Sequence, residues 1–216
     1  GCDGLILINP SKSSDFSMRY YNSDGNLGSM CGNGARCSVK FAQNLNLIND
    51  STVFSAYDGK HDASIFEDSI TLSMKPVSNI KSFENDLFLD TGSPHYVKIV
   101  KDLKKIDVTQ KGREIRNNSV FKKEGVNVNF VEIISDSKFN VRTYERGVEN
   151  ETLSCGTGVT AVAIAMYELK KTSLKKVEII TKGGDLEVEF NKNSKCYNSI
   201  KLTGSVNMVY KGEIQI

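Results

Sequence analysis

The chain has 216 residues, enough to bury a good core as one large domain or two small ones. Its formal net charge of +2 lacks the strong basic excess of nucleic-acid-binding proteins, and no apolar run is long enough to span a membrane. The cysteines number five, an odd count that fits a reducing compartment better than a disulfide scaffold, so we expect a cytoplasmic protein.

The first part of the chain predicts short strands around one helix. Apolar or alternating segments bounded by turn-forming residues cover 5–8, 16–21, 53–57, 63–66 and 70–74. The pair Asp58-Gly59 between two of these segments is typical of a hairpin. We expect a helix from Cys31 to about Asn44 and a change of domain at Pro76.

The second part of the chain predicts more strands and a second main helix. The expected strands cover 96–100, 126–130, 139–144, 177–181, 186–190, 200–202 and 206–210. Residues 102–117 are polar and basic, which indicates a solvated helix and loop, whereas 159–169 are apolar nearly all round, as in a buried helix. Gly183-Gly184 predicts a hairpin. The pattern as a whole favours an α+β fold.

One short motif occurs twice. Cys31-Gly32-Asn33-Gly34 and Cys155-Gly156-Thr157-Gly158 each place a cysteine before Gly-polar-Gly, at the start of an expected helix. The repetition suggests two similar halves. The first turn of a helix has free N–H groups and a partial positive charge, which should lower the pKa of a thiol and could hold a substrate carboxylate. Two such helix starts facing each other would place one sulfur on each side of the adjacent carbon, as acid and base.

Other interpretations of the cysteines are less favourable. A free cysteine is often a small buried hydrophobe, and Cys31 and Cys37 lack the usual zinc-ligand spacing. We favour function for Cys31 and Cys155 because their flanks match. For Cys2, Cys37 and Cys196 we favour a structural role, with Cys37 packed inside the first helix.

Further motifs accompany the two cysteines. They are Tyr21-Asn22-Ser23-Asp24-Gly25, Cys31-Gly32-Asn33-Gly34-Ala35-Arg36-Cys37, Gly92-Ser93-Pro94-His95, Gly125-Val126-Asn127, Tyr144-Glu145-Arg146-Gly147 and Thr152-Leu153-Ser154-Cys155-Gly156-Thr157-Gly158. Over nearly the whole chain this pattern resembles the diaminopimelate epimerase family, which interconverts the LL and meso forms of diaminopimelate in lysine and peptidoglycan precursor biosynthesis. The resemblance implies an isomerase that uses no pyridoxal phosphate, other cofactor or metal.

The resemblance also implies an architecture. It predicts two similar domains, each a mostly antiparallel or mixed sheet wrapped around a central helix, with the active site in the cleft between them. The last strand should return to the first domain, so the expected domains are 1–76 plus 203–216 and 77–202. The expected partner is the small-molecule substrate, without nucleic acid or membrane, and a homodimer is a possible assembly.

The family match assigns roles to individual residues. Cys31 and Cys155 are the expected catalytic pair, and His95 and Glu145 are expected to tune their pKa values. A lone histidine after proline is otherwise most often structural, and His61 is expected in a surface loop. The expected substrate-binding residues are Asn22, Gly32, Asn33, Ser93, Asn127, Glu145, Arg146, Gly156 and Thr157.

The residues themselves leave alternatives beside these roles. The guanidinium of Arg146 is a fixed fork for a carboxylate, although it could also form a surface salt bridge. Asn22 and Asn127 offer donors and acceptors for an amino-acid end but could be ordinary turn residues. Thr157 could serve only the start of its helix.

The chain departs from the family pattern at a few positions. Ser93 stands where many members have asparagine, and Gly4 where some have a substrate-binding glutamine. The family's opening strand, which carries another substrate asparagine, has no counterpart before Gly1. We therefore expect residues 1–216 alone to have an unpaired sheet edge and reduced turnover.

Two rival functions remain at this stage. One is another two-base racemase or isomerase of the same fold, similar to proline racemase. Glu145-Arg146 beside the second cysteine motif argues against it, because that pair suits the distal end of a longer amino acid. The other is a non-catalytic binding protein or a redox thiol protein, which protection of two thiols by substrate would exclude.

Overall fold

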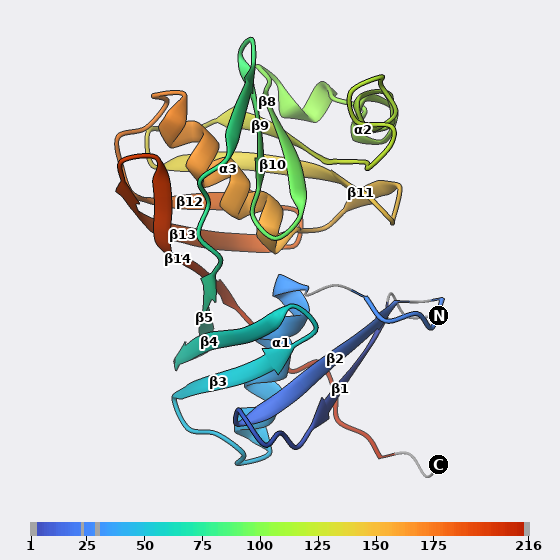
Figure 1. Ribbon diagram of the computed structural model, residues 1–216, viewed down its shortest axis with the longest axis vertical. Coiled ribbons are helices and arrows are strands. Elements are labelled where there is room, and N and C mark those ends of the chain that lie inside the picture. The colour runs from blue at the N-terminus through green and yellow to red at the C-terminus, as the bar shows by residue number, and fades with distance from the viewer. Residues whose placement is uncertain (1–3, 23, 29–30, 214–216) are drawn as a thin grey trace.

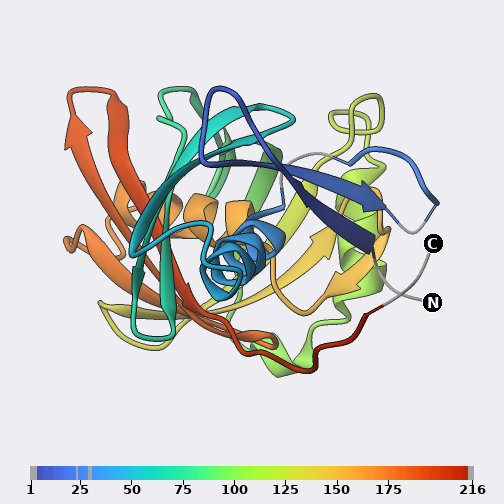
Figure 2. The same cartoon turned by 90° about the horizontal axis from the view of Figure 1, so that it is seen from below.

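The computed structural model describes residues 4–22, 24–28 and 31–213. Figure 1 shows two halves, each with strands arranged around one central helix. The first half consists of β1 (Gly4–Asn9), β2 (Phe16–Asn22), α1 (Gly32–Asn44), β3 (Ser51–Ala56), β4 (Gly59–Phe66) and β5 (Ser69–Met74). In Figure 2 the strands of this half pass around α1.

The second half contains the other central helix, α3. Its elements are β6 (Ile80–Phe83), β7 (Asp86–Asp90), β8 (Pro94–Ile99), the 3-10 helix η1 (Leu103–Lys105), α2 (Val108–Arg116), β9 (Asn127–Ile133), β10 (Lys138–Glu145), β11 (Asn150–Thr152), α3 (Gly156–Glu168), β12 (Lys176–Thr181), β13 (Gly184–Asn193) and β14 (Cys196–Ser205). The α+β fold and both predicted hairpins, β3–β4 and β12–β13, are confirmed.

A single sheet runs through both halves. Its strand order is β1-β2-β3-β4-β5-β14-β13-β12-β10-β9-β8-β7-β6, and β11 pairs with β10 outside this order. Strand β14 joins the halves because it pairs with β13 on one side and with β5, from Ile200 to Ser205, on the other. The last described strand therefore pairs with a strand of the first half, whereas the expected return of residues 203–216 to the first domain stays a prediction. The domain boundary at Pro76 stays a prediction.

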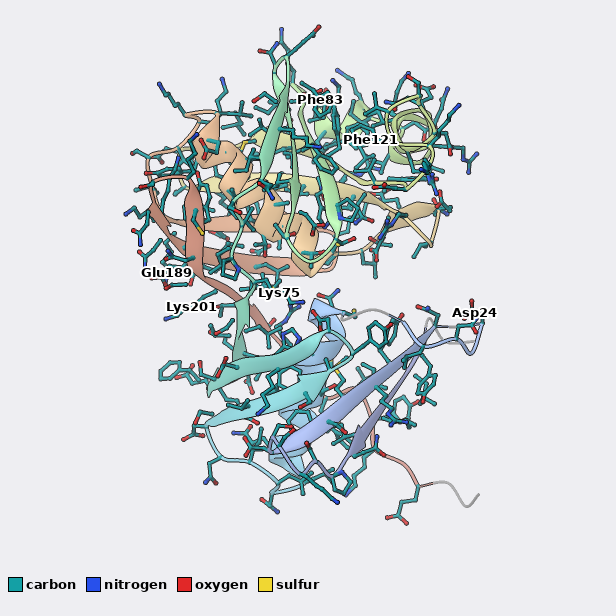
Figure 3. All side chains as sticks on the ribbon, viewed as in Figure 1. Asp24, Lys75, Phe83, Phe121, Glu189 and Lys201 are labelled. Carbon is teal, nitrogen blue, oxygen red and sulfur yellow. The ribbon has the colours of Figure 1, made fainter. Side chains whose placement is uncertain are left out.

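Each central helix fills the core of its half. In α1 the spacing of Ala35, Val39 and Ala42 places all three on one fully buried face, which packs on β2 to β5. Helix α3 is buried on nearly all sides, as its uniform apolarity predicts. A third cluster joins side chains of β9 and β10 to α2 and the neighbouring loops, and in it the rings of Phe83 and Phe121 are 5.7 Å apart (Figure 3).

The structure corrects predictions at three places. Residues 206–210 form no strand, and Met208, Val209 and Tyr210 are exposed, because no neighbouring strand pairs with them in the described part of the chain. Cys37 is exposed, since it lies on the face of α1 opposite the buried one. His61 is buried in β4, where it stacks on Phe54 and contacts Asp58 at 2.7 Å. The prediction of a surface loop missed the inward side of the strand alternation.

None of the helices in the described ranges is long and apolar enough to cross a membrane.

The contact between α2 and β10 makes Gly112 sensitive to substitution. A Cβ atom on Gly112 would lie 2.3 Å from Tyr144 Cβ, so the helix would have to move away from the strand. We expect Gly112→Ala to destabilise the fold by up to about 2 kcal/mol, because an overpacking cost of about 1–3 kcal/mol outweighs the gain of about 1 kcal/mol in helix propensity.

Chemical denaturation of Gly112→Ala measures this effect. Gly212→Ala is the matched control, since a Cβ atom there would meet nothing within 4 Å. Equal denaturation midpoints for the two variants would contradict close packing of α2 on β10.

Candidate active site

The two copies of the repeated motif meet where the halves join. Gly32 and Gly156 are the first residues of α1 and α3. A Cβ atom on Gly32 would lie 3.4 Å from Gly156 Cα, and one on Gly156 would lie 3.3 Å from Gly32 Cα. The two helix starts therefore touch through bare backbone, which brings two partial positive charges and their free N–H groups together.

Each catalytic candidate caps one of these helices. Cys31 (φ −106, ψ 116) and Cys155 (φ −126, ψ 111) have nearly the same extended backbone. The Cys31 sulfur accepts a hydrogen bond from the Gly34 N–H at 3.4 Å, whereas the Cys155 sulfur lies 3.5 Å from the Thr157 hydroxyl. The caps are alike in backbone and differ in the group that faces the sulfur.

Burial dominates the electrostatics of both thiols. It raises the pKa of Cys31, the Gly34 N–H opposes this, and the Glu145 carboxylate adds to it. Burial and then Glu145 raise the pKa of Cys155 to about 12. The predicted lowering by the helix starts is therefore wrong for this structure, because removing a thiolate from water costs more than the helix N–H groups return.

Glu145 lies at the end of β10 with its charge acting on both sulfurs. Thr152 donates a hydrogen bond to its carboxylate at 3.0 Å, while burial raises the pKa of the Glu145 carboxyl. The neighbouring Arg146 instead donates to the backbone carbonyl of Glu124 at 2.8 Å. The two residues thus find separate partners, as adjacent residues of an extended segment should.

The thiols of Cys31 and Cys155 offer a direct test of this electrostatic coupling. Glu145 is ionised at the alkaline pH where they titrate, so Glu145→Gln removes a negative charge and should lower both thiol pKa values. We expect the alkylation rate of Cys155, followed by peptide mass spectrometry, to rise at lower pH than in the wild type.

Glu114→Gln is the control, because Glu114 lies exposed on α2 and pairs with Lys111. An unchanged alkylation profile in Glu145→Gln would show that its charge does not reach the sulfurs.

His95 stands behind the second motif. Its side chain is fully buried, and Nε2 lies 2.9 Å from the Thr157 hydroxyl. Burial and then Arg146 lower the pKa of His95 to about 3, so the ring is neutral at pH 7. The histidine thus reaches Cys155 through Thr157, and its role in tuning a thiol pKa stays a prediction.

Asn127 holds together the residues expected at the distal end of the substrate. Its amide donates to Ser93 Oγ at 2.9 Å and to the Pro94 carbonyl at 3.1 Å, and its oxygen accepts the Arg146 N–H at 2.8 Å. Ser93 is therefore part of this cluster. Arg146 is exposed, and its guanidinium bonds a backbone carbonyl and forms no ion pair among the described residues, so the surface-salt-bridge alternative is not seen.

The asparagines of the first half behave differently from each other. Asn22 ends β2 in a tight turn, where its N–H bonds the Asn26 carbonyl, and no side-chain bond in the described ranges joins it to the other candidates. Asn33 donates from its side chain to the Ser154 carbonyl at 3.1 Å. Its side chain therefore links the two cysteine loops, and only its backbone N–H is directed by the helix start.

Two residues that support the site had no role predicted from the sequence. Arg36 is only 7% exposed and donates to Asn33 Oδ1 at 2.9 Å, while its Nε and Nη1 have no hydrogen-bond partner among the described residues. A charged residue on the apolar face of α1 was the available signal. Asn129 is fully buried next to His95. Because Asn129 alternates with Val128 and Phe130 in the sequence, it was expected on the opposite face of the strand and no role was assigned to it.

Across residues 4–22, 24–28 and 31–213, no group of three or more histidine, cysteine or acidic side chains could hold a metal ion. The four cysteines in these ranges are free.

Comparison with known proteins identifies relatives over nearly the whole of this chain. The family model described as diaminopimelate epimerase matches residues 1–79 and 87–209. The diaminopimelate epimerase of Flavobacterium psychrophilum is 48% identical over 99% of this chain and 84% of its own length. That of Aquifex aeolicus is 39% identical over 99% of this chain and 80% of its own.

Solved structures share the fold at low identity. A Bacillus anthracis phenazine biosynthesis protein of the PhzF family aligns with a TM-score of 0.73 and 16% identity, over 95% of this chain and 82% of that one. A probable proline racemase from Agrobacterium radiobacter aligns with a TM-score of 0.66 and 14% identity, over 94% and 73%. With the matching family model and these closely similar relatives, the chain belongs to the diaminopimelate epimerase family.

Proposed function

We propose that this chain interconverts LL- and meso-diaminopimelate by two-base proton transfer at the α-carbon. The observation that supports this most directly is the backbone contact of two helix starts, each capped by a buried or half-buried cysteine. A carboxylate at this junction would receive N–H groups from both helices. We infer the identity of the substrate from the relatives, which are named diaminopimelate epimerases.

The proposed chemistry uses groups of this chain alone. Backbone N–H groups of Gly32, Asn33, Gly156 and Thr157 bind the α-carboxylate and stabilise the charge that develops when the α-proton leaves. One cysteine, as thiolate, accepts that proton. The other cysteine, as thiol, donates its proton to the opposite face of the carbon, so the configuration inverts and one thiolate is regenerated in place of the other.

The distal end of the substrate fixes its position. We assign its carboxylate to the guanidinium of Arg146 and its ammonium group to Glu145, with Asn22, Asn127 and Ser93 as further polar contacts. Support comes from the cluster in which Asn127 holds Ser93 and the Arg146 backbone. His95 tunes the thiol of Cys155 through Thr157, and Glu145 tunes both thiols through its charge.

Solvent isotope incorporation tests the proposal. LL-diaminopimelate incubated with the protein in deuterium oxide should gain one deuterium at the inverted α-carbon, as seen by mass spectrometry and proton NMR. Proline, the substrate of the rival function, should gain none. Deuterium in proline and none in diaminopimelate would overturn the assignment in favour of the rival.

Location, assembly and domain limits are proposals of the same kind. We propose a cytoplasmic enzyme, supported by the odd cysteine count and the free thiols, with a homodimer as a possible assembly. We also propose 1–76 plus 203–216 and 77–202 as its two domains, supported by the separate cores around α1 and α3. Light scattering measures the assembly, and limited proteolysis near Pro76 tests the boundary.

A further inference from the structure

A chain of side chains leads from the interior of the second half to the Cys155 sulfur. Asn129 on β9 is fully buried, and its Nδ2 lies 3.1 Å from His95 Nδ1. The other ring nitrogen of His95 contacts the Thr157 hydroxyl at 2.9 Å, and that hydroxyl lies 3.5 Å from Cys155 Sγ. The direction of each hydrogen bond in this series follows from the orientation of the Asn129 amide.

The orientation of the Asn129 amide is set by two neighbours. Its Nδ2 lies 3.3 Å from the backbone carbonyl of Tyr96, which can only accept, so the NH₂ group must face that side. The Thr143 hydroxyl donates to Asn129 Oδ1 at 2.9 Å on the other side. The second amide hydrogen therefore points at His95 Nδ1, and a flipped amide would set two acceptors against each other.

This orientation determines the tautomer of His95. Because Nδ1 accepts from Asn129 and the fully buried ring is neutral, its single proton resides on Nε2. Nε2 must then donate to the Thr157 oxygen, which leaves the Thr157 hydrogen free to donate to Cys155 Sγ. With the opposite tautomer, His95 Nε2 would be an acceptor and Thr157 would donate to it. The Cys155 sulfur could then bond to Thr157 only by donating its own S–H proton, that is, as a thiol.

We propose that Asn129 is a positioning residue that, by setting the tautomer of His95, makes Thr157 donate to Cys155 and so favours its thiolate form. The inference rests on the proposed function in that Cys155 then serves as an acid–base group. It also distinguishes the two thiols, because the Cys31 sulfur is bonded by backbone N–H groups, and among the described residues no hydroxyl is bonded to it. The relay offsets part of the rise in thiol pKa that burial causes.

The wild-type protein tests the first step without any variant. The sequence has two histidines, so nitrogen-15 labelling of histidine gives two rings to assign, with His61→Gln leaving only His95. We expect a neutral His95 ring that carries its proton on Nε2 from pH 5 to 9. A proton on Nδ1, or a doubly protonated ring, would overturn the proposal.

Variants test the remaining steps through the pH profile of Cys155 alkylation. Thr157→Val removes the hydroxyl at constant shape and should move the profile up by about one pH unit, while Thr157→Ser should keep it. Asn129→Leu should move it the same way. In the double variant the two shifts should not add, because both substitutions act through one hydrogen bond. If Asn129 had only a structural role, the two shifts would add. The profile of Cys31 is the internal control.

Two results from the variants would also contradict the relay: additive shifts in the double variant, or a Cys155 profile unchanged in Thr157→Val. If Asn129→Leu does not fold, the tautomer of His95 in the wild type and the comparison of Thr157→Val with Thr157→Ser still test the proposal. None of these measurements uses diaminopimelate turnover. A protein that exchanges no deuterium into diaminopimelate could therefore still show the relay, and an active enzyme could lack it.

Discussion

Replacing either Cys31 or Cys155 by serine is expected to lower epimerisation by about 10²–10⁴-fold, the usual contribution of a positioned acid or base. Serine has nearly the same size and keeps the helix cap, but its hydroxyl ionises far less readily than a thiol. Either single loss should stop turnover in both directions, because each direction needs one base on one face of the α-carbon and one acid on the other.

The measurement is the interconversion of the LL and meso isomers, followed by chromatography of both. Cys37→Ser is the matched control, since Cys37 lies exposed on the same helix as the Cys31 cap and touches no proposed substrate group. A Cys31→Ser or Cys155→Ser enzyme with near wild-type turnover would disprove the two-cysteine mechanism.

Arg146→Lys is expected to raise the Michaelis constant for diaminopimelate by about 10²-fold, with a smaller change in kcat. The guanidinium can bind a carboxylate with two parallel hydrogen bonds, and an ammonium group cannot reproduce that geometry. A hydrogen bond to a charged group contributes about 1.5–3 kcal/mol, so losing one of the two accounts for a change of this size. The contact is made equally before and in the transition state, so the loss should appear mainly in the Michaelis constant.

Steady-state kinetics with both isomers measures this effect. Arg19→Lys is the control, because Arg19 is exposed on β2, away from the end of β10. The backbone N–H of Arg146 bonds to Asn127 in either variant, so the local fold is retained. An unchanged Michaelis constant would remove Arg146 from the distal carboxylate site.

Much of the fold follows from local patterns. The alternation of Ile70 and Leu72 with polar residues, the turn at 58–59 and the uniform apolarity of α3 each describe a segment whose state depends on its own residues. The predicted strand at 206–210 failed for the complementary reason. The segment is mostly apolar, but a strand needs a partner, and no described strand pairs with it.

Single side chains were harder to place than elements. Cys37 and His61 were assigned to the wrong environment because one residue's shift around a helix or along a strand changes the face it occupies. The thiol pKa values were also misjudged. A helix start is visible in the sequence, but the burial that outweighs it comes from residues far along the chain.

The sequence by itself determined the family, the two helices and the cysteine that begins each of them, because these depend on short motifs and local periodicity. Only the tertiary structure decided that Gly32 touches Gly156 and that Asn129 reaches Cys155 through His95 and Thr157. The physical reason is that a thiol's proton affinity depends on burial and on the direction of hydrogen bonds, and both are set by strands that meet only after the chain has folded.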